Sequence, residues 1–326
     1  MIEYIIDNNL KDIRLDKFVK KVLPLAPDSF VYKLFRKKDV KVNKKHQPMD
    51  YVTKVGDVIS IYVNDTQKED FTTNKEIKIS NRKDFDVIYE DNNVLIVNKY
   101  EGLLVHEGDE DKKDEDTLTS QVLHYLGYKQ GDIFMPSLAH RIDRNTSGVV
   151  VFGKTNNALV ELFEAFKDHT NMEKEYVALV SGKLKESGIV DVPLIKNEKT
   201  KIVNVDKING KKATTKYEPI TIYDDVTLVK VTLLTGRTHQ IRVHMKYLGY
   251  PLVGDQKYGN KNSDMLAKKY GMENYFLHAR RLVFHNLKND MSYLNDKQFV
   301  ASYPKSKEIV LNKLIKKDYN NIEEAL

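Results

Sequence analysis

The spacing of apolar residues divides the chain into a short N-terminal part and a longer part with a different rhythm. Apolar side chains recur at helical intervals over residues 14–22 and 29–37. Strand-like residues follow at 40–42 and, after a turn, at 58–61. The pattern therefore predicts two short helices followed by a small sheet within residues 14–62.

The remainder of the chain mixes strands and helices without a regular strand–helix–strand rhythm. Residues 64–83 are polar and aperiodic, which predicts a linker between domains at 1–75 and 84–326. The irregular mixture favours an α+β fold over a doubly wound parallel sheet. The clearest expected elements are a hairpin at 87–97, strands at 149–152 and 226–234, helices at 159–166 and 240–248, and an amphipathic tail helix at 305–326 built on Ile309, Leu311, Leu314 and Ile315.

The composition is that of an ordinary globular protein and excludes several classes. Of the 326 residues, 41% are hydrophobic and 31% are charged, which argues against a disordered chain. The absence of cysteine excludes a disulfide framework and thiolate metal sites. No apolar run reaches membrane-span length, and the N-terminal sequence lacks the features of a signal peptide. We therefore expect a cytoplasmic protein without membrane contact.

The distribution of charge is more informative than its total. The chain carries a net charge of +6, yet residues 11–45 alone hold twelve Lys and Arg against four acids, a net +8. Such a concentration is typical of a surface that binds a phosphate backbone. A solvated lysine-rich face explains the charge equally well. The candidate contacts are Lys33, Arg36 and Lys37 on the second predicted helix and Lys41 on the following strand.

A first polar cluster, at residues 139–148, directly precedes the strand expected at 149–152. It places Asp143 between Arg141 and Arg144, and neighbouring arginines favour the ionised carboxylate. An oriented carboxylate in a cleft is a competent nucleophile or base. Taken alone, a salt-bridged surface loop is the more common explanation of this pattern.

A second cluster, at residues 234–245, runs from a strand through a glycine turn into a helix. Arg237, His239 and Arg242 lie near the expected helix N-terminus, where phosphate groups bind well. His239 and His244 are not spaced as a zinc-binding pair and have no acid between them, so a metal site is not favoured, and we expect His244 to be structural.

A third cluster opens an apolar strand at residues 174–180. Tyr176 in this strand is expected to be a core residue by default, because tyrosines commonly bury their rings and leave the hydroxyl at the rim. An aromatic platform for a flipped base is the functional alternative.

In order and spacing, the three clusters resemble the RluA family of pseudouridine synthases. Residues 14–57 also resemble an S4 RNA-binding domain, so that most of residues 14–285 is covered. The matching segments are His140–Gly148, Glu173–Tyr176, Gly236–His244, Leu248–Asp255, Tyr258–Gly259, Leu277–Ala279, Asn98–Lys99 and Gly102–His106.

The resemblance implies a fold and a set of roles. The fold would be a mixed, largely antiparallel sheet flanked by helices and loops, preceded by the S4 domain of two helices and a short sheet. Asp143 would attack the target uridine, Arg242 would hold Asp143 ionised, and Tyr176 would stack on the base and help to remove its proton. Arg141 would fill the space left by the flipped base. Further RNA contacts are expected at His140, Arg144, Arg237 and His239. Ile241 and Val243 would also contact the RNA and form the apolar floor of the pocket.

The resemblance also implies what the protein acts with. Large-subunit ribosomal RNA is the leading substrate and transfer RNA the second, while no metal, cofactor, nucleoside triphosphate or obligate protein partner is implied, and a monomer is expected. Ile142, Asn145 and Tyr100 depart from the family pattern of leucine, aspartate and proline. With the acidic segment 107–116, these departures bear on the choice of RNA rather than on the chemistry.

Two other classes of function remain open from the sequence. A non-catalytic RNA-binding or ribosome-assembly factor could keep the same fold, although the joint presence of Asp143, Tyr176 and Arg242 argues against it. A nuclease or phosphotransferase that uses Asp143 for metal binding is less favoured, because no second carboxylate lies nearby with ligand spacing.

Overall fold

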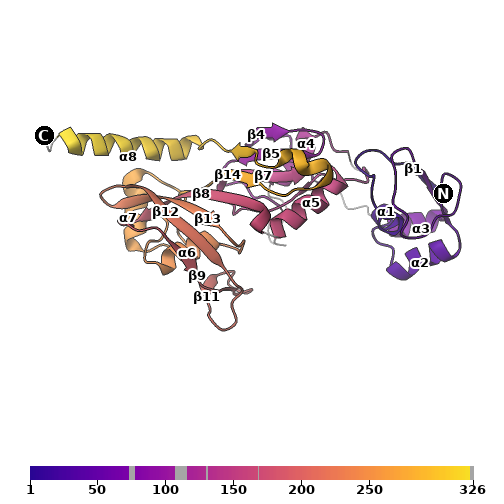
Figure 1. Ribbon diagram of the computed structural model, residues 1–326, viewed down its shortest axis with the longest axis horizontal. Coiled ribbons are helices and arrows are strands. Elements are labelled where there is room, and N and C mark those ends of the chain that lie inside the picture. Colours follow the sequence, from indigo (N-terminus) through magenta and orange to yellow (C-terminus); the bar gives the residue numbers. More distant parts are fainter. Residues whose placement is uncertain (73–77, 107–115, 130, 168, 324–326) are drawn as a thin grey trace.

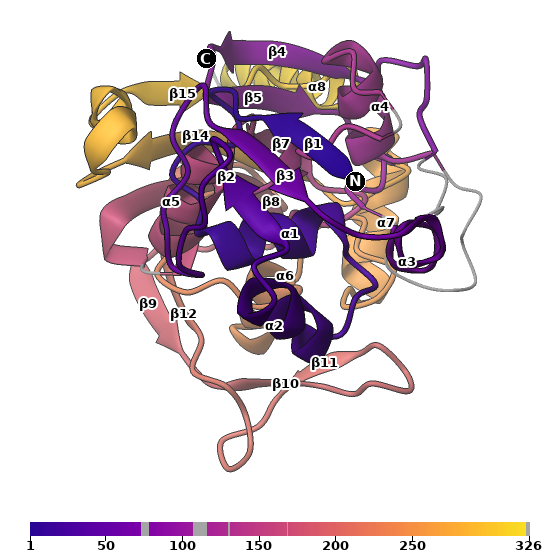
Figure 2. The same cartoon turned by 90° about the vertical axis from the view of Figure 1, so that its right-hand side faces the viewer.

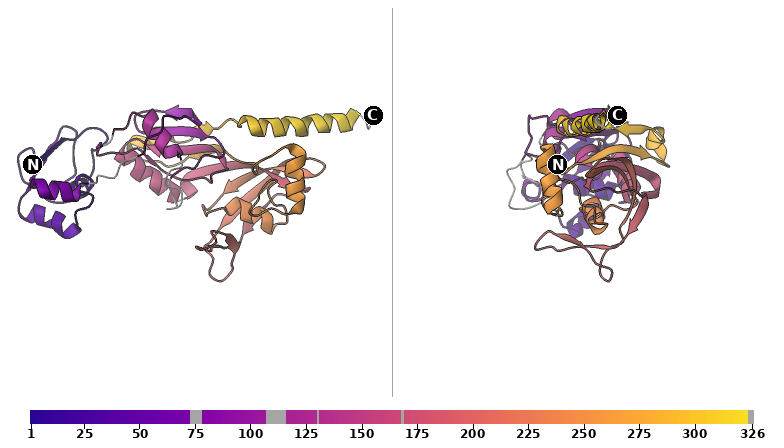
Figure 3. Two further views of the ribbon diagram at one scale, coloured as in Figure 1. Left: turned by 180° about the vertical axis from the view of Figure 1, so that it is seen from behind. Right: turned by 90° about the vertical axis from the view of Figure 1, so that its left-hand side faces the viewer.

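The computed structural model describes the chain except for residues 73–77, 107–115, 130, 168 and 324–326. Nearly all of the acidic segment 107–116 therefore lies outside the described residues. The molecule is elongated, with a small N-terminal unit at one end, a large sheet in the middle and a long helix at the other end (Figures 1 and 3).

The N-terminal unit combines a three-stranded antiparallel sheet with short helices. The sheet order is β1-β3-β2, and Figure 2 shows the sheet beside α1 and α2. Leu15, Phe18 and Val19 of α1 are completely buried, as the helical spacing of these residues requires. The bounds are β1 Ile2–Ile5, α1 Leu15–Val22, α2 Asp28–Arg36, β2 Val40–Val42, β3 Val58–Ile61 and α3 Asp65–Phe71.

Helix α3 lies within residues 64–83, where the polar, aperiodic sequence predicted a linker and no helix was expected. Asn64 caps this helix by accepting a hydrogen bond from the backbone of Gln67, whose side chain bonds back to the backbone of Asn64. The ring of Phe71 lies 4.5 Å from that of Phe30 and ties the helix to α2. The polar composition concealed the helix because its stabilising contacts are a capping box and one aromatic pair.

The rest of the chain is built on a ten-stranded sheet with the order β4-β5-β7-β14-β8-β13-β12-β9, with β15 paired to β14 and β6 to β7. Every pairing is antiparallel except that of β7 with β14, which confirms the expected mixed, largely antiparallel sheet of an α+β fold. The strands are β4 Phe85–Glu90, β5 Val94–Lys99, β6 Ser137–Leu138, β7 Ser147–Gly153, β8 Met172–Ser181, β9 Gly188–Asp191, β12 Thr214–Ile222, β13 Val226–Leu233, β14 Leu277–Phe284 and β15 Gln298–Val300.

The helices and a separate two-stranded hairpin lie outside this sheet. The expected hairpin at 87–97 and the helices at 159–166 and 240–248 are confirmed as β4–β5, α5 and α6. The remaining bounds are α4 Leu118–Tyr125, α5 Asn156–Lys167, η2 His169–Asn171, β10 Leu194–Lys196, β11 Val203–Val205, α6 Gln240–Tyr247, α7 Lys261–Tyr270, η3 Asn289–Leu294 and α8 Lys305–Glu323.

The tail helix exists, but its buried face differs from the prediction. Val310 and Leu314 of α8 are buried, whereas Ile309 and Ile315 are 46% and 45% exposed. Lys307 is buried on the same side as Val310 and Leu314 and forms an ion pair with Glu101. The apolar spacing alone did not reveal that the aliphatic part of a lysine completes this face.

One close approach in the sheet brings the polar clusters together. Gly148 of β7 has a φ of +115°, and a Cβ atom built there would lie 2.2 Å from the carbonyl oxygen of Ala279. Only glycine fits, so β7 can run in parallel beside β14 at this point. Ala279 is paired on its other side with Tyr176 of β8. The loop that precedes Gly148 and carries Asp143 is thereby held beside Tyr176.

Candidate active site

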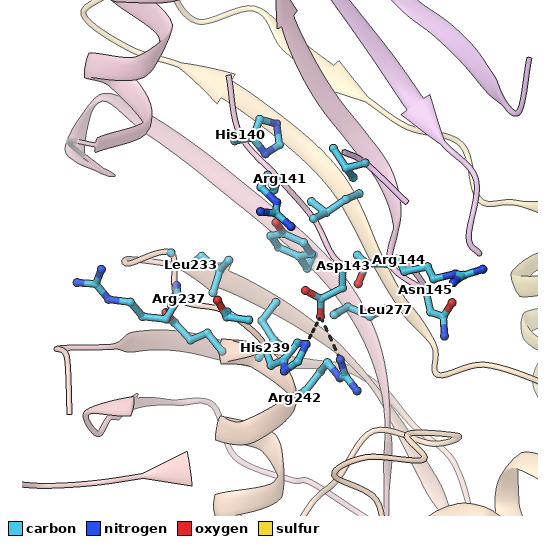
Figure 4. Close-up of a pocket in the computed structure, with 18 of the residues that line it drawn as sticks. His140, Arg141, Asp143, Arg144, Asn145, Leu233, Arg237, His239, Arg242 and Leu277 are labelled. Atoms are coloured by element: carbon cyan, nitrogen blue, oxygen red, sulfur yellow. Dashed lines mark hydrogen bonds and ion pairs between the residues drawn. The ribbon is translucent and has the colours of Figure 1, made fainter. Parts of the chain in front are cut away.

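The first and second clusters and Tyr176 line one pocket of about 770 Å³ (Figure 4). The loop between β6 and β7 forms one wall, and the N-terminus of α6 forms the opposite wall. Among the described residues that line it, Asp143 is the only acid, while Arg141, Lys174, Arg237 and Arg242 are among the basic ones. The pocket is therefore electropositive around a single carboxylate.

Asp143 lies opposite Arg242, as the resemblance implied. Nη1 of Arg242 donates a hydrogen bond of 3.2 Å to Oδ2 of Asp143. The hydroxyl of Tyr275 and Nε2 of His239 lie 3.5 and 3.8 Å from the same oxygen. All three groups approach Oδ2, so the carboxylate is oriented through one of its two oxygens.

Arg242 is fixed from behind by Asp255. Nε and Nη2 of Arg242 donate hydrogen bonds of 2.8 Å to Oδ2 and Oδ1 of Asp255. Burial acts to lower the pKa of Arg242, but the hydrogen bonds and charge of Asp255 outweigh it and raise that pKa. The guanidinium also lies 4.4 Å from the ring centre of Tyr275 and 4.9 Å from that of Tyr258. Arg242 is consequently a permanent and immobile cation.

His239 is held at the N-terminus of α6 by an unusual backbone conformation. Its φ of +54° is left-handed, and its Nδ1 lies 2.7 Å from the hydroxyl of Tyr258. Burial lowers the pKa of His239, while the charge of Asp143 opposes this shift. A neutral imidazole at this position is a hydrogen-bonding group rather than a second cation beside Arg242.

Tyr176 presents an aromatic wall to the pocket. Its side chain is 7% exposed, and burial together with the charge of Asp143 raises the pKa of its hydroxyl. The phenol therefore remains protonated at neutral pH. Ile241, Leu233 and Leu277 also line the pocket and supply apolar surface.

Val243 does not line the pocket, contrary to the prediction that it forms the apolar floor with Ile241. It is buried and packs with Leu194 and Val203 of the β10–β11 hairpin, and with Tyr258. Residues two apart on a helix point in different directions, so Ile241 and Val243 cannot share one surface.

The other predicted contacts divide between the pocket and the N-terminal unit. His140, Arg141, Arg144 and Arg237 line the pocket, and Nε of Arg144 and of Arg237 donate hydrogen bonds to the carbonyls of Gly102 and Lys212. The N-terminal candidates do not line it: Lys33, Arg36 and Lys37 are exposed, and Lys41 is half-buried over Tyr62.

His244 has the structural role expected of it. Its two ring nitrogens lie 2.8 Å from the hydroxyl of Thr215 and 3.1 Å from the carbonyl of Val192, and the residue is fully buried. In the part of the chain that is described, no group of three or more His, Asp or Glu is arranged to hold a metal ion. The described helices likewise include none with the length and apolarity to span a bilayer.

Sequence reasoning missed Asp255, Tyr258 and Tyr275 as site residues. Asp255 and Tyr258 lie within segments that carried the family resemblance, so the match at these positions could have identified them as site residues. Tyr275 lies two residues before the start of β14 and in no such segment. Its proximity to Asp143 arises only from the pairing of distant strands.

Comparisons with known proteins identify the family to which the chain is similar. Residues 93–247 match a family model described as RNA pseudouridylate synthase. The chain is 35% identical over 288 residues to ribosomal large subunit pseudouridine synthase C of Vibrio parahaemolyticus, covering 87% of this chain and 89% of that protein. It is 33% identical over 306 residues to the Haemophilus influenzae protein of the same name, covering 92% and 91%.

A solved structure supports the fold assignment. The chain is similar to human RNA pseudouridylate synthase domain containing 4, with a TM-score of 0.55 and 24% identity over 70% of this chain and 92% of that one. At this identity the likeness concerns the fold alone. Asp143, Tyr176 and Arg242 all lie within the segment that matches the family model.

Proposed function

Because this chain belongs to the RNA pseudouridylate synthase family, in its RluA type, we propose that it converts specific uridines of large-subunit ribosomal RNA to pseudouridine with Asp143 as the nucleophile. The observation that carries the assignment of Asp143 is its 3.2 Å hydrogen bond with Arg242 inside an otherwise basic pocket. The relatives named above are ribosomal large subunit enzymes, which supports ribosomal RNA over transfer RNA as the substrate.

The proposed reaction is an isomerisation in which all atoms stay with the nucleotide. Asp143 attacks carbon C1′ of the sugar of the flipped uridine, the bond between C1′ and N1 of uracil breaks, and the base turns. C5 then bonds to C1′ as the bond between C1′ and Asp143 breaks and frees the carboxylate, and the proton on C5 leaves while N1 gains one. Since Arg242, Tyr275 and His239 all approach Oδ2, we assign the attack to Oδ1 of Asp143.

The surrounding side chains have roles that follow from their positions. Arg242 orients Asp143 through its hydrogen bond, and the ring of Tyr176 stacks on the detached base. The hydroxyl of Tyr176, which stays protonated, assists the departure of the C5 proton as a relay rather than as a preformed phenolate. Apolar Ile241 and Leu277 limit water around the base, so that rebonding precedes hydrolysis.

Arg141 and the N-terminal unit are assigned to RNA binding. Arg141 is exposed beside the pocket, where its guanidinium can occupy the stack vacated by the flipped base. Residues 1–75 are proposed to act as an S4-type domain, because α2 presents Lys33 and Arg36 to solvent and its C-cap residue Lys37 is also exposed. A monomer acting in the cytoplasm completes the proposal.

Tritium release from RNA labelled at C5 of uridine tests the chemistry. The wild type and Asp264→Asn, a control on the exposed face of α7, should release tritium at the same rate. Asp143→Asn should release none above background. Release that persists in Asp143→Asn would remove the assigned nucleophile, and no release by the wild type would favour the non-catalytic RNA-binding factor.

The RNA substrate is tested separately by mapping. Pseudouridines should disappear from large-subunit ribosomal RNA when the gene is deleted and return when the wild-type gene, but not Asp143→Asn, is restored. Loss of pseudouridine from transfer RNA alone would instead assign the second candidate substrate.

A further inference from the structure

One end of the pocket contains two buried polar groups that have no role in the reaction described above. His140 stacks on Phe166 with ring centres 4.2 Å apart and planes 20° apart. The amine of Lys174 lies 5.7 Å from the centre of the same ring. Figure 4 shows His140 and Arg141 at the end of the pocket away from Arg242. The described lining of this end contains no acid.

Among the residues that the structure describes, one nitrogen of His140 has no hydrogen-bond partner and the amine of Lys174 has no ion-pair partner, facing only the ring of Phe166. Nε2 of His140 is buried without a hydrogen bond. Lys174 is only 9% exposed, and desolvation alone accounts for its pKa, which burial lowers to about 8. Burying an amine without an ion pair is unfavourable. An unpaired amine in a pocket wall therefore indicates a ligand that supplies the opposite charge.

The electrostatics identify the chemistry of that ligand. A neutral uracil ring could accept a hydrogen bond from Lys174 but could not neutralise its charge. A phosphodiester can do both. Burial and the charge of Lys174 lower the pKa of His140 to about 3, against the effect of its hydrogen bond to the backbone of Arg141, so its ring is neutral at pH 7 and leaves Lys174 as the charged group.

The position of Lys174 relative to the aromatic platform also fits a phosphate. Lys174 and Tyr176 are two residues apart on β8 and therefore face the same side of the sheet. This separation is about 7 Å along the strand. Exposed Arg141, on the adjacent loop, adds a second cation near this end.

We propose that Lys174, beside the neutral ring of His140, forms a subsite for a backbone phosphate of the RNA, adjacent to the uridine that enters the pocket. This subsite rests on the proposed function for the identity of its RNA. Phosphate binding there holds the backbone on the far side of Tyr176 from Arg242 and so positions the flipped nucleotide. Lys174 is accordingly a binding residue for the strand and takes no part in bond breaking.

The test replaces single phosphates of the RNA by neutral methylphosphonates. The substrate is a short ribosomal RNA fragment that contains the mapped uridine, and each of the phosphates flanking this uridine is replaced in turn. Wild-type kcat/KM should fall at least tenfold at one of these positions. If no flanking methylphosphonate changes the rate by more than twofold, the phosphate subsite is wrong, without reliance on any variant.

Variants then connect the sensitive phosphate to Lys174. Lys174→Met should reduce kcat/KM on native RNA at least tenfold, and it should show no further loss when the sensitive phosphate is neutralised. Lys174→Arg keeps the charge and should recover most of the loss. The control Lys183→Met, at an exposed lysine outside the pocket, should behave as the wild type at every phosphate. If neutralising the sensitive phosphate reduced kcat/KM of Lys174→Met as much as that of the wild type, another group would bind this phosphate. That result would overturn the proposal.

Binding measurements separate failure of the subsite from failure of the proposed function. The affinity of Asp143→Asn for the same RNAs does not require turnover. If tritium release is absent but one methylphosphonate weakens binding in a manner that depends on Lys174, the isomerase assignment fails and the subsite stands. If release is normal and affinity is insensitive to every flanking phosphate, the subsite alone fails.

Discussion

Arg242 and Asp255 form a two-point ion pair beneath the pocket, with both N···O distances at 2.8 Å. A bidentate pair fixes the plane of the guanidinium as well as its position. Nη1 then faces Asp143 and cannot rotate away. Oδ1 of Asp255 also accepts hydrogen bonds of 3.0 Å from the backbone N–H groups of Lys257 and Tyr258. The orientation of the proposed nucleophile therefore depends on a carboxylate that does not contact the substrate.

Asp255→Asn should impair both stability and turnover. The substitution removes the charge that balances buried Arg242, and breaking a buried ion pair in this way costs about 3 kcal/mol or more. The amide also turns an N–H group toward Nε of Arg242, which frees the guanidinium to rotate. We expect kcat to fall at least tenfold while KM changes little, because Asp255 orients a catalytic group. Urea unfolding and steady-state kinetics on the same RNA measure the two effects.

The stability effect of Asp255→Asn should depend on pH. Burial acts to raise the pKa of Asp255, but the hydrogen bonds and charge of Arg242 outweigh it and lower that pKa. A carboxylate with a lowered pKa stabilises the fold above the ordinary Asp value of about 4 and loses this effect as pH falls through its folded pKa. The difference in unfolding free energy between wild type and variant should therefore be full at pH 7 and shrink in acid. A difference unaffected by pH would mean that packing, not charge, is responsible.

The sequence predicted the pairing of Asp143 with Arg242 through segments that resemble a family, and 99 residues of chain separate the two. It could not predict that Tyr275 lies beside them, because this contact depends on β14 entering between β7 and β8. Periodicity located α8 but not its buried face, since Lys307 takes a place that an apolar residue usually occupies. The prediction that Val243 lines the pocket was wrong, because the β10–β11 hairpin covers this residue of α6.

Lys99 offers a second test of how the pocket wall is assembled. Its fully buried amine donates hydrogen bonds of 2.8, 2.9 and 2.8 Å to the carbonyls of Tyr100, Leu103 and Arg144. Lys99→Met would leave three carbonyls without this donor and release the Asp143 loop from residues 100–103. We expect the free energy of unfolding to fall by about 3 kcal/mol or more. Thermal and urea unfolding should show this, with exposed Lys129→Met unchanged.

The role of the N-terminal unit is tested by the salt dependence of binding. Replacing Lys33, Arg36 and Lys37 together with glutamine should weaken RNA binding. It should also reduce the slope of log K against log salt by about 0.7 to 0.9 for each RNA phosphate that the variant no longer neutralises. A matched triple replacement of exposed Lys261, Lys268 and Lys305 should leave the slope unchanged. Equal slopes for wild type and the α2 variant would mean that this basic face is only solvated.

Burial lowers the pKa of both Lys99 and Lys174, to about 7 and about 8, but Lys174 leads to a prediction of opposite sign because only Lys99 donates hydrogen bonds to carbonyls that would be left without this donor. The folded pKa of Lys174, about 8, lies below the ordinary lysine value of about 10.4. Its charge therefore destabilises the free protein, by about 3 kcal/mol if the whole shift is expressed. Lys174→Met removes this charge and keeps a flexible apolar chain against Phe166. The variant should be more stable than the wild type at pH 7 and less active on RNA.

The pH dependence of that stability gain follows from the direction of the shift. Below pH 8 both the folded and the unfolded wild type carry the proton, and the full penalty applies. Between about pH 8 and 10.4 the folded protein releases the proton while the unfolded chain keeps it, so the penalty declines and then disappears. The advantage of Lys174→Met in urea unfolding should accordingly vanish near pH 10, whereas Lys183→Met should match the wild type throughout. A variant that is less stable than the wild type at pH 7 would show that Lys174 is compensated within the free protein and that no ligand is needed to complete it.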